Sequence, residues 1–180
     1  AAHLRLFGNK GQARASAIAA NVPVLEGIDR SVTLDEAREF LSRHPQGIVI
    51  KAVAGGGGRG TRAVTDANEL EEAFNRCRSE AGAAFGIEDV YVEVFMPQAR
   101  HIEVQIIGDA HGAVVDLGER ECSAQRRNQK VVEIAPAPNL AEEVRRDIID
   151  AALRFAAQEG YQSLGTFEFL LSSEAGATDV

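Results

Sequence analysis

Four consecutive glycines follow a short apolar run in the stretch "KAVAGGGGRGTR", which spans residues 51–62. A turn made of glycines leaves its backbone N–H groups uncovered, and successive N–H groups form an anion-binding concavity that suits phosphate. Lys51 precedes the glycines and Arg59 directly follows them, so both cations can face a phosphate chain. The pattern is neither GxxxxGK[ST] nor GxGxxG followed by a helix. The stretch therefore indicates a phosphate-binding loop of another kind, and the alternative is a flexible surface hairpin.

A second stretch, "CSAQRRNQK" at residues 122–130, combines Arg126, Arg127 and Lys130 with amide side chains. Such a group of donors suits an oxyanion, and Lys130 could hold a small anion such as a carboxylate or carbonate. Successive side chains of an extended segment point to opposite sides, so Arg126 and Arg127 cannot both face one site. The alternative is a solvated surface loop.

A carboxylate and a histidine complete the candidate set. Glu168 alternates with Phe167 and Phe169 in "GTFEFLL", and a carboxylate buried there would need a cation. A Mg²⁺ ion that bridges phosphates would supply one, whereas the alternative is a solvated sheet face. His101 opens a strand, where a histidine is more often structural than a ligand. Together these features are typical of ATP-dependent phosphoryl transfer to an oxyanion, in which catalysis is mostly positioning and charge neutralisation.

Helix and strand patterns alternate along the chain that must position these residues. Helices are expected from Asn9 to about Ala20, over "TLDEAREFLSRH" with a capping box of Thr33 and Glu36, over residues 66–85, and from Asn139 and Glu142 to about Gln158. Strands are expected in "GIVIKAV", "TRAV", "DVYVEVF", the hairpin "HIEVQIIGD" to "AVVDLGERE", and "LGTFEFLL", whereas the polar "CSAQRRNQKVVE" indicates an irregular segment. We therefore predict an α+β fold with two lobes. Residues 23–95 would carry the glycine loop, and residues 96–180 would form an antiparallel sheet with a helix packed on it.

Composition limits the function classes. The chain has 180 residues, a formal net charge of −8 at pH 7 and a pI of about 5.1, whereas a nucleic-acid binder usually presents a basic face. No run approaches the length of a membrane helix, and the N-terminus lacks a signal-peptide layout. Cys77 and Cys122 show no CxxC spacing. We expect a cytoplasmic protein with reduced thiols and with neither nucleic acid nor membrane as a partner.

Four motifs occur in order along the chain: "KAVAGGGGRGTRAV", "YVEVFMPQARHIEVQIIGD", "GERECSAQRRNQKVVEIAPAP" and "GTFEFLL". They resemble the biotin carboxylase component of biotin-dependent carboxylases, an ATP-grasp enzyme, and their order and spacing match over essentially all 180 residues. The resemblance implies an ATP-grasp fold, in which a mobile glycine-loop lobe and a larger antiparallel lobe clamp the nucleotide. It implies ATP-dependent carboxylation of biotin by bicarbonate through carboxyphosphate. Residues 1–22 would then be the helix that leads in from an N-terminal lobe.

Carried over motif by motif, the resemblance implies roles for individual residues. Lys10 and Lys51 would contact the ATP phosphates, Gly57 and Gly58 would lie over them, Glu93, Val94, Phe95 and Met96 would meet the adenine, His101 would lie near the ribose, and Gln125 and Asn128 would line the nucleotide pocket. Lys130 would be the catalytic residue that holds bicarbonate, and Glu168 would bind Mg²⁺ or Mn²⁺. Val94 replaces a lysine that is common in the family, so a side-chain contact with adenine is lost there.

The resemblance also implies groups that these 180 residues do not contain. The family's second metal carboxylate, catalytic arginine and glutamate base belong to a motif like "EMNPRLQVEH", which the chain lacks, as it lacks the Rossmann-like N-terminal lobe. We expect a fold truncated at both ends and no biotin carboxylase activity from the chain alone. Bicarbonate-dependent ATPase activity of the purified chain would contradict this. Biotin would be carried on a separate domain, and the partners would be biotin carrier and carboxyltransferase domains or subunits of an oligomeric parent enzyme.

Two other functions stay open. An ATP-grasp ligase similar to carbamoyl-phosphate synthase also begins with carboxyphosphate, although "RRNQK" and "APAP" favour the biotin enzyme. A non-catalytic nucleotide-binding or scaffolding module is the other alternative. The final carboxyl acceptor (acetyl-CoA, propionyl-CoA, another acyl-CoA, pyruvate or urea) is not determined by these residues.

Overall fold

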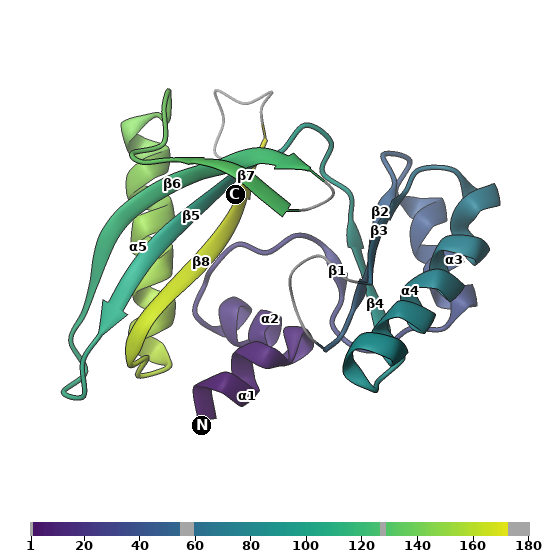
Figure 1. Ribbon diagram of the computed structural model, residues 1–180, viewed down its shortest axis with the longest axis horizontal. Coiled ribbons are helices and arrows are strands. Elements are labelled where there is room, and N and C mark those ends of the chain that lie inside the picture. Colours follow the sequence, from purple (N-terminus) through teal and green to yellow (C-terminus); the bar gives the residue numbers. More distant parts are fainter. Residues whose placement is uncertain (1, 55–59, 127–128, 173–180) are drawn as a thin grey trace. The chain divides into compact units, whose positions relative to one another are not determined.

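The computed structural model describes residues 2–54, 60–126 and 129–172. The chain divides into two compact units. Unit 1 comprises Ala1–Ala15 and Leu25–Pro97, and unit 2 comprises Ser16–Val24 and Gln98–Val180. Each unit has its own sheet and its own hydrophobic core, so each is described by itself (Figure 1).

Unit 1 is built on an antiparallel sheet with the strand order β1-β4-β2-β3 in the described part of the chain. Its elements are α1 (Ala2–Gly8), the first residues of α2 (Lys10–Ala19), β1 (Gly27–Ile28), α3 (Leu34–Arg43), β2 (Ile48–Ala52), β3 (Thr61–Val64), the 3₁₀ turn η1 (Ala67–Glu69), α4 (Leu70–Phe85) and β4 (Val90–Val94). The strands β2 and β3 form the expected hairpin, with Lys51 opposite Thr61. The glycine loop therefore connects two paired strands, and residues 55–59 of it lie outside the described residues.

Alternation along β2 and β4 divides the sheet of unit 1 into two faces. Ile48, Ile50 and Val92 are fully buried and pack against side chains of α3 and α4 such as Phe40 and Phe74. The intervening residues point to the opposite face because successive side chains of a strand alternate. This opposite face carries Lys51 of β2 and Tyr91 and Glu93 of β4, and it is called the polar face of unit 1 below.

The helix α3 begins as the sequence predicts. The Thr33 side chain accepts a hydrogen bond from the Glu36 N–H at 3.2 Å, and the Glu36 carboxylate accepts one from the Thr33 N–H at 2.8 Å. This capping box satisfies two backbone donors that the first helical turn leaves unpaired.

Unit 2 is built on a second antiparallel sheet, with the order β7-β6-β5-β8 in the described residues. Its strands are β5 (Arg100–Gly108), β6 (Val114–Arg126), β7 (Gln129–Ile134) and β8 (Ser163–Leu171), and α5 (Glu142–Gln158) lies along one face of the sheet (Figure 1). Ile102, Val104 and Ile106 of β5 are fully buried in a cluster with Ile148 and Ala152 of α5. The residues between them must therefore face away from α5.

Two sequence-based predictions for unit 2 were wrong. The described residues of "CSAQRRNQKVVE" are not irregular, because β6 continues to Arg126 and pairs with β7 through Gln125 and Lys130. Every residue of β7 is exposed, so this edge strand lacks the alternation of apolar and polar residues that would mark it in the sequence. The helix expected from Asn139 begins only at Glu142. Asn139 has a φ of +51°, and its carbonyl accepts a hydrogen bond from Arg100 at 3.2 Å, which holds this segment outside the helix.

Within residues 2–54, 60–126 and 129–172, no helix is long and apolar enough to cross a membrane.

Candidate active site

The polar face of unit 1 gathers a buried carboxylate and its donors. Tyr91 and Glu93 alternate with buried Val90 and Val92 along β4, and Lys51 lies opposite Tyr91 on the neighbouring β2. Glu93 is buried, with 7% of its side chain exposed. Its carboxylate accepts hydrogen bonds from Lys51 Nζ, from Arg14 Nη1 at 2.9 Å and from the Tyr91 hydroxyl at 3.2 Å. The carboxylate is thus fully compensated by two cations and a hydroxyl.

Arg14, from α2, joins this carboxylate to the rest of unit 1. It also forms an ion pair with Asp29, and its Nη2 donates to the Leu25 carbonyl at 2.6 Å. Burial acts to lower the pKa of Arg14, but the bond to Asp29 and the charge of Glu93 outweigh it and raise this pKa. For Tyr91, burial raises the pKa, so its hydroxyl stays protonated and donates.

Lys10 lies at the end of β2, the strand that carries Lys51. Its Nζ donates to the carbonyl of Ala52 at 3.0 Å, and Asn9 forms an isolated bridge with Ala54. Ala52 directly follows Lys51, so the start of α2 brings a second lysine to the strand that leads into the glycine loop. Gly57 and Gly58 of that loop lie outside the described residues.

The segment expected to meet adenine comprises the last two residues of β4, Glu93 and Val94, and the two that follow, Phe95 and Met96. The N–H of Val94 donates to the carbonyl of Glu26 at 2.9 Å, and the N–H of Phe95 donates to that of Gly47 at 3.0 Å. Val94, Phe95 and Met96 are half-buried. Since two backbone donors are already used within unit 1, any hydrogen bond from this segment to a ligand must come from another backbone group, of which the Met96 N–H is the next along the chain.

The face of unit 2 that points away from α5 has a buried carboxylate at its centre. Glu103 lies between the buried Ile102 and Val104, and its side chain is 0% exposed. It is paired across the sheet with Arg120 of β6 and with Glu168 of β8. Arg120 Nη2 donates to one Glu103 oxygen at 2.7 Å, and Lys130 Nζ of β7 donates to the other.

These contacts set the charges of the cluster. Burial alone would raise the pKa of Glu103, but the bonds from Lys130 and Arg120 outweigh burial, so this pKa lies below its ordinary value. Burial would lower the pKa of Lys130, yet the bond to Glu103 raises it. Both groups are therefore charged at neutral pH.

His101 lies on the same side of β5 and adjoins both carboxylates. Its Nε2 is 3.5 Å from a Glu103 oxygen and 3.9 Å from a Glu168 oxygen. The amide Nε2 of Gln125 lies 2.7 Å from His101 Nδ1 and 2.9 Å from the Cys122 carbonyl. With the amide as donor, the neutral ring carries its proton on Nε2. That nitrogen is buried and has no hydrogen-bond partner among the described residues.

A carboxylate oxygen of Glu168 fits a magnesium ligand, because its side chain is 65% exposed and Mg²⁺ takes one or two carboxylates together with phosphate oxygens. The charge balance supports this fit. The ion pairs and contacts around Glu103 join two cations, Lys130 and Arg120, with three carboxylates, Glu103, Glu133 and Glu168. These five side chains sum to one negative charge, which repels an anionic substrate. A divalent cation reverses that sign.

The structure brings the predicted residues together in two sets. Lys10, Lys51 and Glu93 share one region of unit 1, and His101, Gln125, Lys130 and Glu168 share one face of unit 2. Asn128 lies outside the described residues. Glu103, Arg120 and Arg14 also take part in these contacts and were not predicted from the sequence. The signal for Glu103 was its place between two apolar residues, two positions after His101 on an alternating strand, whereas no local pattern marks Arg14.

Comparisons with known proteins place this geometry in a class. Residues 9–178 match the family described as carbamoyl-phosphate synthase L chain, ATP binding domain. A biotin carboxylase from Campylobacter jejuni, solved as a β,γ-ATP complex, has a TM-score of 0.89 and 41% identity, covering 92% of this chain and 37% of that one. The biotin carboxylase domain of 2-oxoglutarate carboxylase from Hydrogenobacter thermophilus, solved with MgADP, ADP and bicarbonate, has a TM-score of 0.90 and 38% identity, covering 96% and 38%.

Curated relatives are similar over most of the chain. Pyruvate carboxylase 1 of Caenorhabditis elegans is 53% identical over 169 residues, which is 93% of this chain and 14% of the relative. Mitochondrial pyruvate carboxylase of Homo sapiens is 50% identical over 169 residues, again 93% and 14%. The chain thus spans about a seventh of the length of the curated relatives it matches.

The two antiparallel sheets, with α3 and α4 packed on one and α5 on the other, have the ATP-grasp fold of biotin carboxylases, as the sequence motifs predict. The chain belongs to the family of the carbamoyl-phosphate synthase L chain, ATP binding domain.

Proposed function

We propose that this chain binds MgATP and is the ATP-binding part of a biotin carboxylase, which carboxylates biotin with bicarbonate through carboxyphosphate. The observation that carries the proposal is the Glu103 cluster, where Lys130, Arg120, His101 and Glu168 gather on one open face of a sheet. This set combines an oxyanion-binding lysine with an exposed metal carboxylate. Similarity to biotin carboxylases solved with nucleotide and with bicarbonate supports it.

In unit 1, Lys51 and Lys10 would bind phosphate oxygens, with Gly57 and Gly58 covering them. Both lysines lie at the strand that leads into the glycine loop. Hydrogen bonds from a charged ammonium to phosphate are stronger than those between neutral groups. The segment Glu93, Val94, Phe95 and Met96 would meet the adenine through its backbone, since Glu93 uses its carboxylate within the unit.

In unit 2, Lys130 would hold bicarbonate. Its side chain is 31% exposed, so the ammonium keeps room for an anion while Glu103 orients it. His101 would donate from Nε2 to a ribose hydroxyl, which would satisfy its buried nitrogen. Gln125 would hold the His101 ring in place, with Asn128 as a further contact of the nucleotide.

Glu168 would bind Mg²⁺ or Mn²⁺, and the metal would neutralise phosphate charge when bound. Lys130 would orient the bicarbonate oxygens, and Lys10 and Lys51 would orient the phosphates, because positioning supplies much of the rate in phosphoryl transfer.

The longer protein would contain or bind biotin carrier and carboxyltransferase domains, and would be oligomeric. Pyruvate is the acceptor to test first, because the curated relatives are pyruvate carboxylases. Carbamoyl-phosphate synthesis is a second candidate, because the family description names that enzyme. Biotin-dependent against ammonia-dependent turnover of ATP by the longer protein separates the two.

The proposal is tested by titrating the chain with MgATP in a calorimeter. Lys51→Ala should weaken binding by about 1–3 kcal/mol, the usual scale for a charge-assisted contact, and Gly57→Val should weaken it comparably by blocking backbone approach. Arg76→Ala, on an exposed face of α4, is the matched control and should bind normally. In the longer enzyme, Lys130→Ala should impair bicarbonate use and spare ATP affinity. No binding by the unsubstituted chain would overturn the proposal.

A further inference from the structure

We propose that Arg14 is a positioning residue: through the buried carboxylate of Glu93 it determines where Lys51 presents its ammonium group to nucleotide phosphate. This role rests on the proposed function, because it presumes that Lys51 binds phosphate. Arg14 itself would touch neither nucleotide nor bicarbonate.

Three side chains donate to the Glu93 carboxylate. Arg14 Nη1 donates to Glu93 Oε1 at 2.9 Å, the Tyr91 hydroxyl donates to the same oxygen at 3.2 Å, and Lys51 Nζ donates to Oε2. Each carboxylate oxygen therefore has its own donors. Since Oε1 is held from two directions, the direction in which Oε2 points is determined as well, and with it the place of Lys51 Nζ.

Burial gives this arrangement its rigidity. Exposed fractions of the side chains are 7% for Glu93 and 11% for Arg14, against 26% for Lys51. The carboxylate is thus buried, the guanidinium is mostly buried, and the lysine is the most exposed of the three. An ammonium group has three donors, and Glu93 accepts one of them among the described residues, so Lys51 can bind a phosphate oxygen without leaving Glu93.

Arg14 is held as firmly as the carboxylate that it anchors. Its guanidinium bonds Asp29, the Leu25 carbonyl and Glu93 at once. The three contacts use three different nitrogens of the planar guanidinium, whereas a lysine has its three donors on one nitrogen and cannot reach the same three acceptors. A positioning role therefore predicts that Arg14→Lys does not preserve function.

Gly27, in the strand next to Glu93, leaves room for the contact between Arg14 and Glu93. Gly27 of β1 is the partner of Glu93 in the sheet, and a Cβ there would lie 3.1 Å from Glu93 Cγ and 3.2 Å from Arg14 Nη2. It would also lie 2.8 Å from the Val92 carbonyl oxygen. Glycine at this position lets the guanidinium approach the carboxylate along the strand.

A double-mutant cycle with MgATP binding as the readout tests the role. Arg14→Met should raise the Kd about tenfold, a shift of about 1.4 kcal/mol, when Lys51 is present. In the Lys51→Met background the same change should alter the Kd by less than about twofold, because there is no ammonium left to position. Arg78→Met, which removes the exposed pair with Glu88 in the same unit, is the control and should leave the Kd unchanged.

Equal effects of Arg14→Met in the two backgrounds would overturn the proposal, because a general structural role is independent of Lys51. If Arg14→Met fails to fold, Glu93→Gln, of nearly the same shape, replaces it in the cycle with the same expected results. Urea unfolding verifies that each variant is folded.

A second readout needs no nucleotide and so separates this role from the proposed function. The rate at which an amine-selective reagent labels Lys51, followed by peptide mass spectrometry, should rise several-fold in Arg14→Met and in Glu93→Gln. An unchanged labelling rate would overturn the positioning role even if MgATP binds. Failure of the unsubstituted chain to bind MgATP, with the labelling rates changed as expected, would overturn the proposed function and leave Arg14 as the residue that positions Lys51.

Discussion

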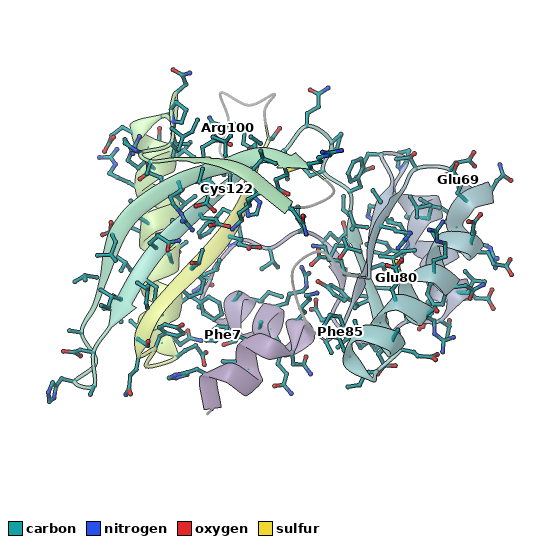
Figure 2. The ribbon with its side chains drawn as sticks, in the orientation of Figure 1. Phe7, Glu69, Glu80, Phe85, Arg100 and Cys122 are labelled. Atoms are coloured by element: carbon teal, nitrogen blue, oxygen red, sulfur yellow. The ribbon has the colours of Figure 1, made fainter. Side chains whose placement is uncertain are left out.

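Lys130 on β7 forms an ion pair with Glu103 on β5, although β6 lies between these two strands. The pair spans the sheet because Arg120, directly opposite Glu103 on β6, takes the other carboxylate oxygen and leaves Lys130 to reach across. Cys122 of β6 is buried in the same sheet (Figure 2), and its thiol adjoins the carboxylates of Glu103 and Glu133. The centre of the proposed site in unit 2 is therefore also a centre of its stability.

Replacing Glu103 should destabilise the protein far more than replacing its cross-strand neighbour. Glu103→Ala leaves Arg120 and Lys130 without their carboxylate and should lower the free energy of unfolding by about 3 kcal/mol, as when a buried ion pair is broken. Glu168→Ala, on the exposed partner residue, should change it by less than about 0.5 kcal/mol. Urea denaturation measures both, and equal effects would contradict the burial of Glu103.

Acid should lower the free energy of unfolding by protonating Glu103. The pKa of Glu103 is lower in the folded state than its ordinary value of 4.5 because of its bonds to Lys130 and Arg120, which outweigh burial. The unfolded state therefore binds more protons, and stability is retained above pH 4.5 and lost as the pH falls through the folded pKa. Glu103→Gln should show a shallower loss between neutral and acid pH in denaturation curves. An unchanged pH slope would show that the carboxylate does not contribute.

The capping box of α3 should contribute a measurable share of the stability of unit 1. Thr33→Ala removes the acceptor for the Glu36 N–H and should lower the free energy of unfolding by about 1 kcal/mol. Ser42→Ala, an exposed position near the other end of the same helix, should have little effect and serves as the control. Thermal unfolding followed by circular dichroism compares the two, and a larger loss in Ser42→Ala would contradict the assignment of the cap.

Both thiols should be inert until the protein unfolds. Cys77 and Cys122 are 0% exposed, and burial raises the pKa of both, that of Cys122 to about 11 from 9.0. Little thiolate is present near neutral pH, and the reagent cannot reach it. Ellman's reagent should therefore react slowly with the native protein and fully in denaturant. Rapid native reaction of Cys122 would show that the sheet opens beside Glu103.

The sequence by itself determined much of this protein. A short β-branched run located β2, alternating faces located β4, and a hairpin pattern located β5. The Thr33–Glu36 spacing predicted the start of α3. These signals are local, because each lies within the element or at its end. The motifs also predicted the ATP-grasp fold, which is confirmed. The roles of individual site residues stay predictions.

Only the tertiary structure decided which distant charges meet. Arg14 reaches Glu93 across 79 positions, and Lys130 reaches Glu103 across 27. The edge strand β7 was missed because exposure on both faces removes the alternation that marks a strand. A buried carboxylate requires a cation wherever it lies, so the sequence can predict that such a carboxylate has a cationic partner. Strand order and register select the cation, and they are properties of the folded chain.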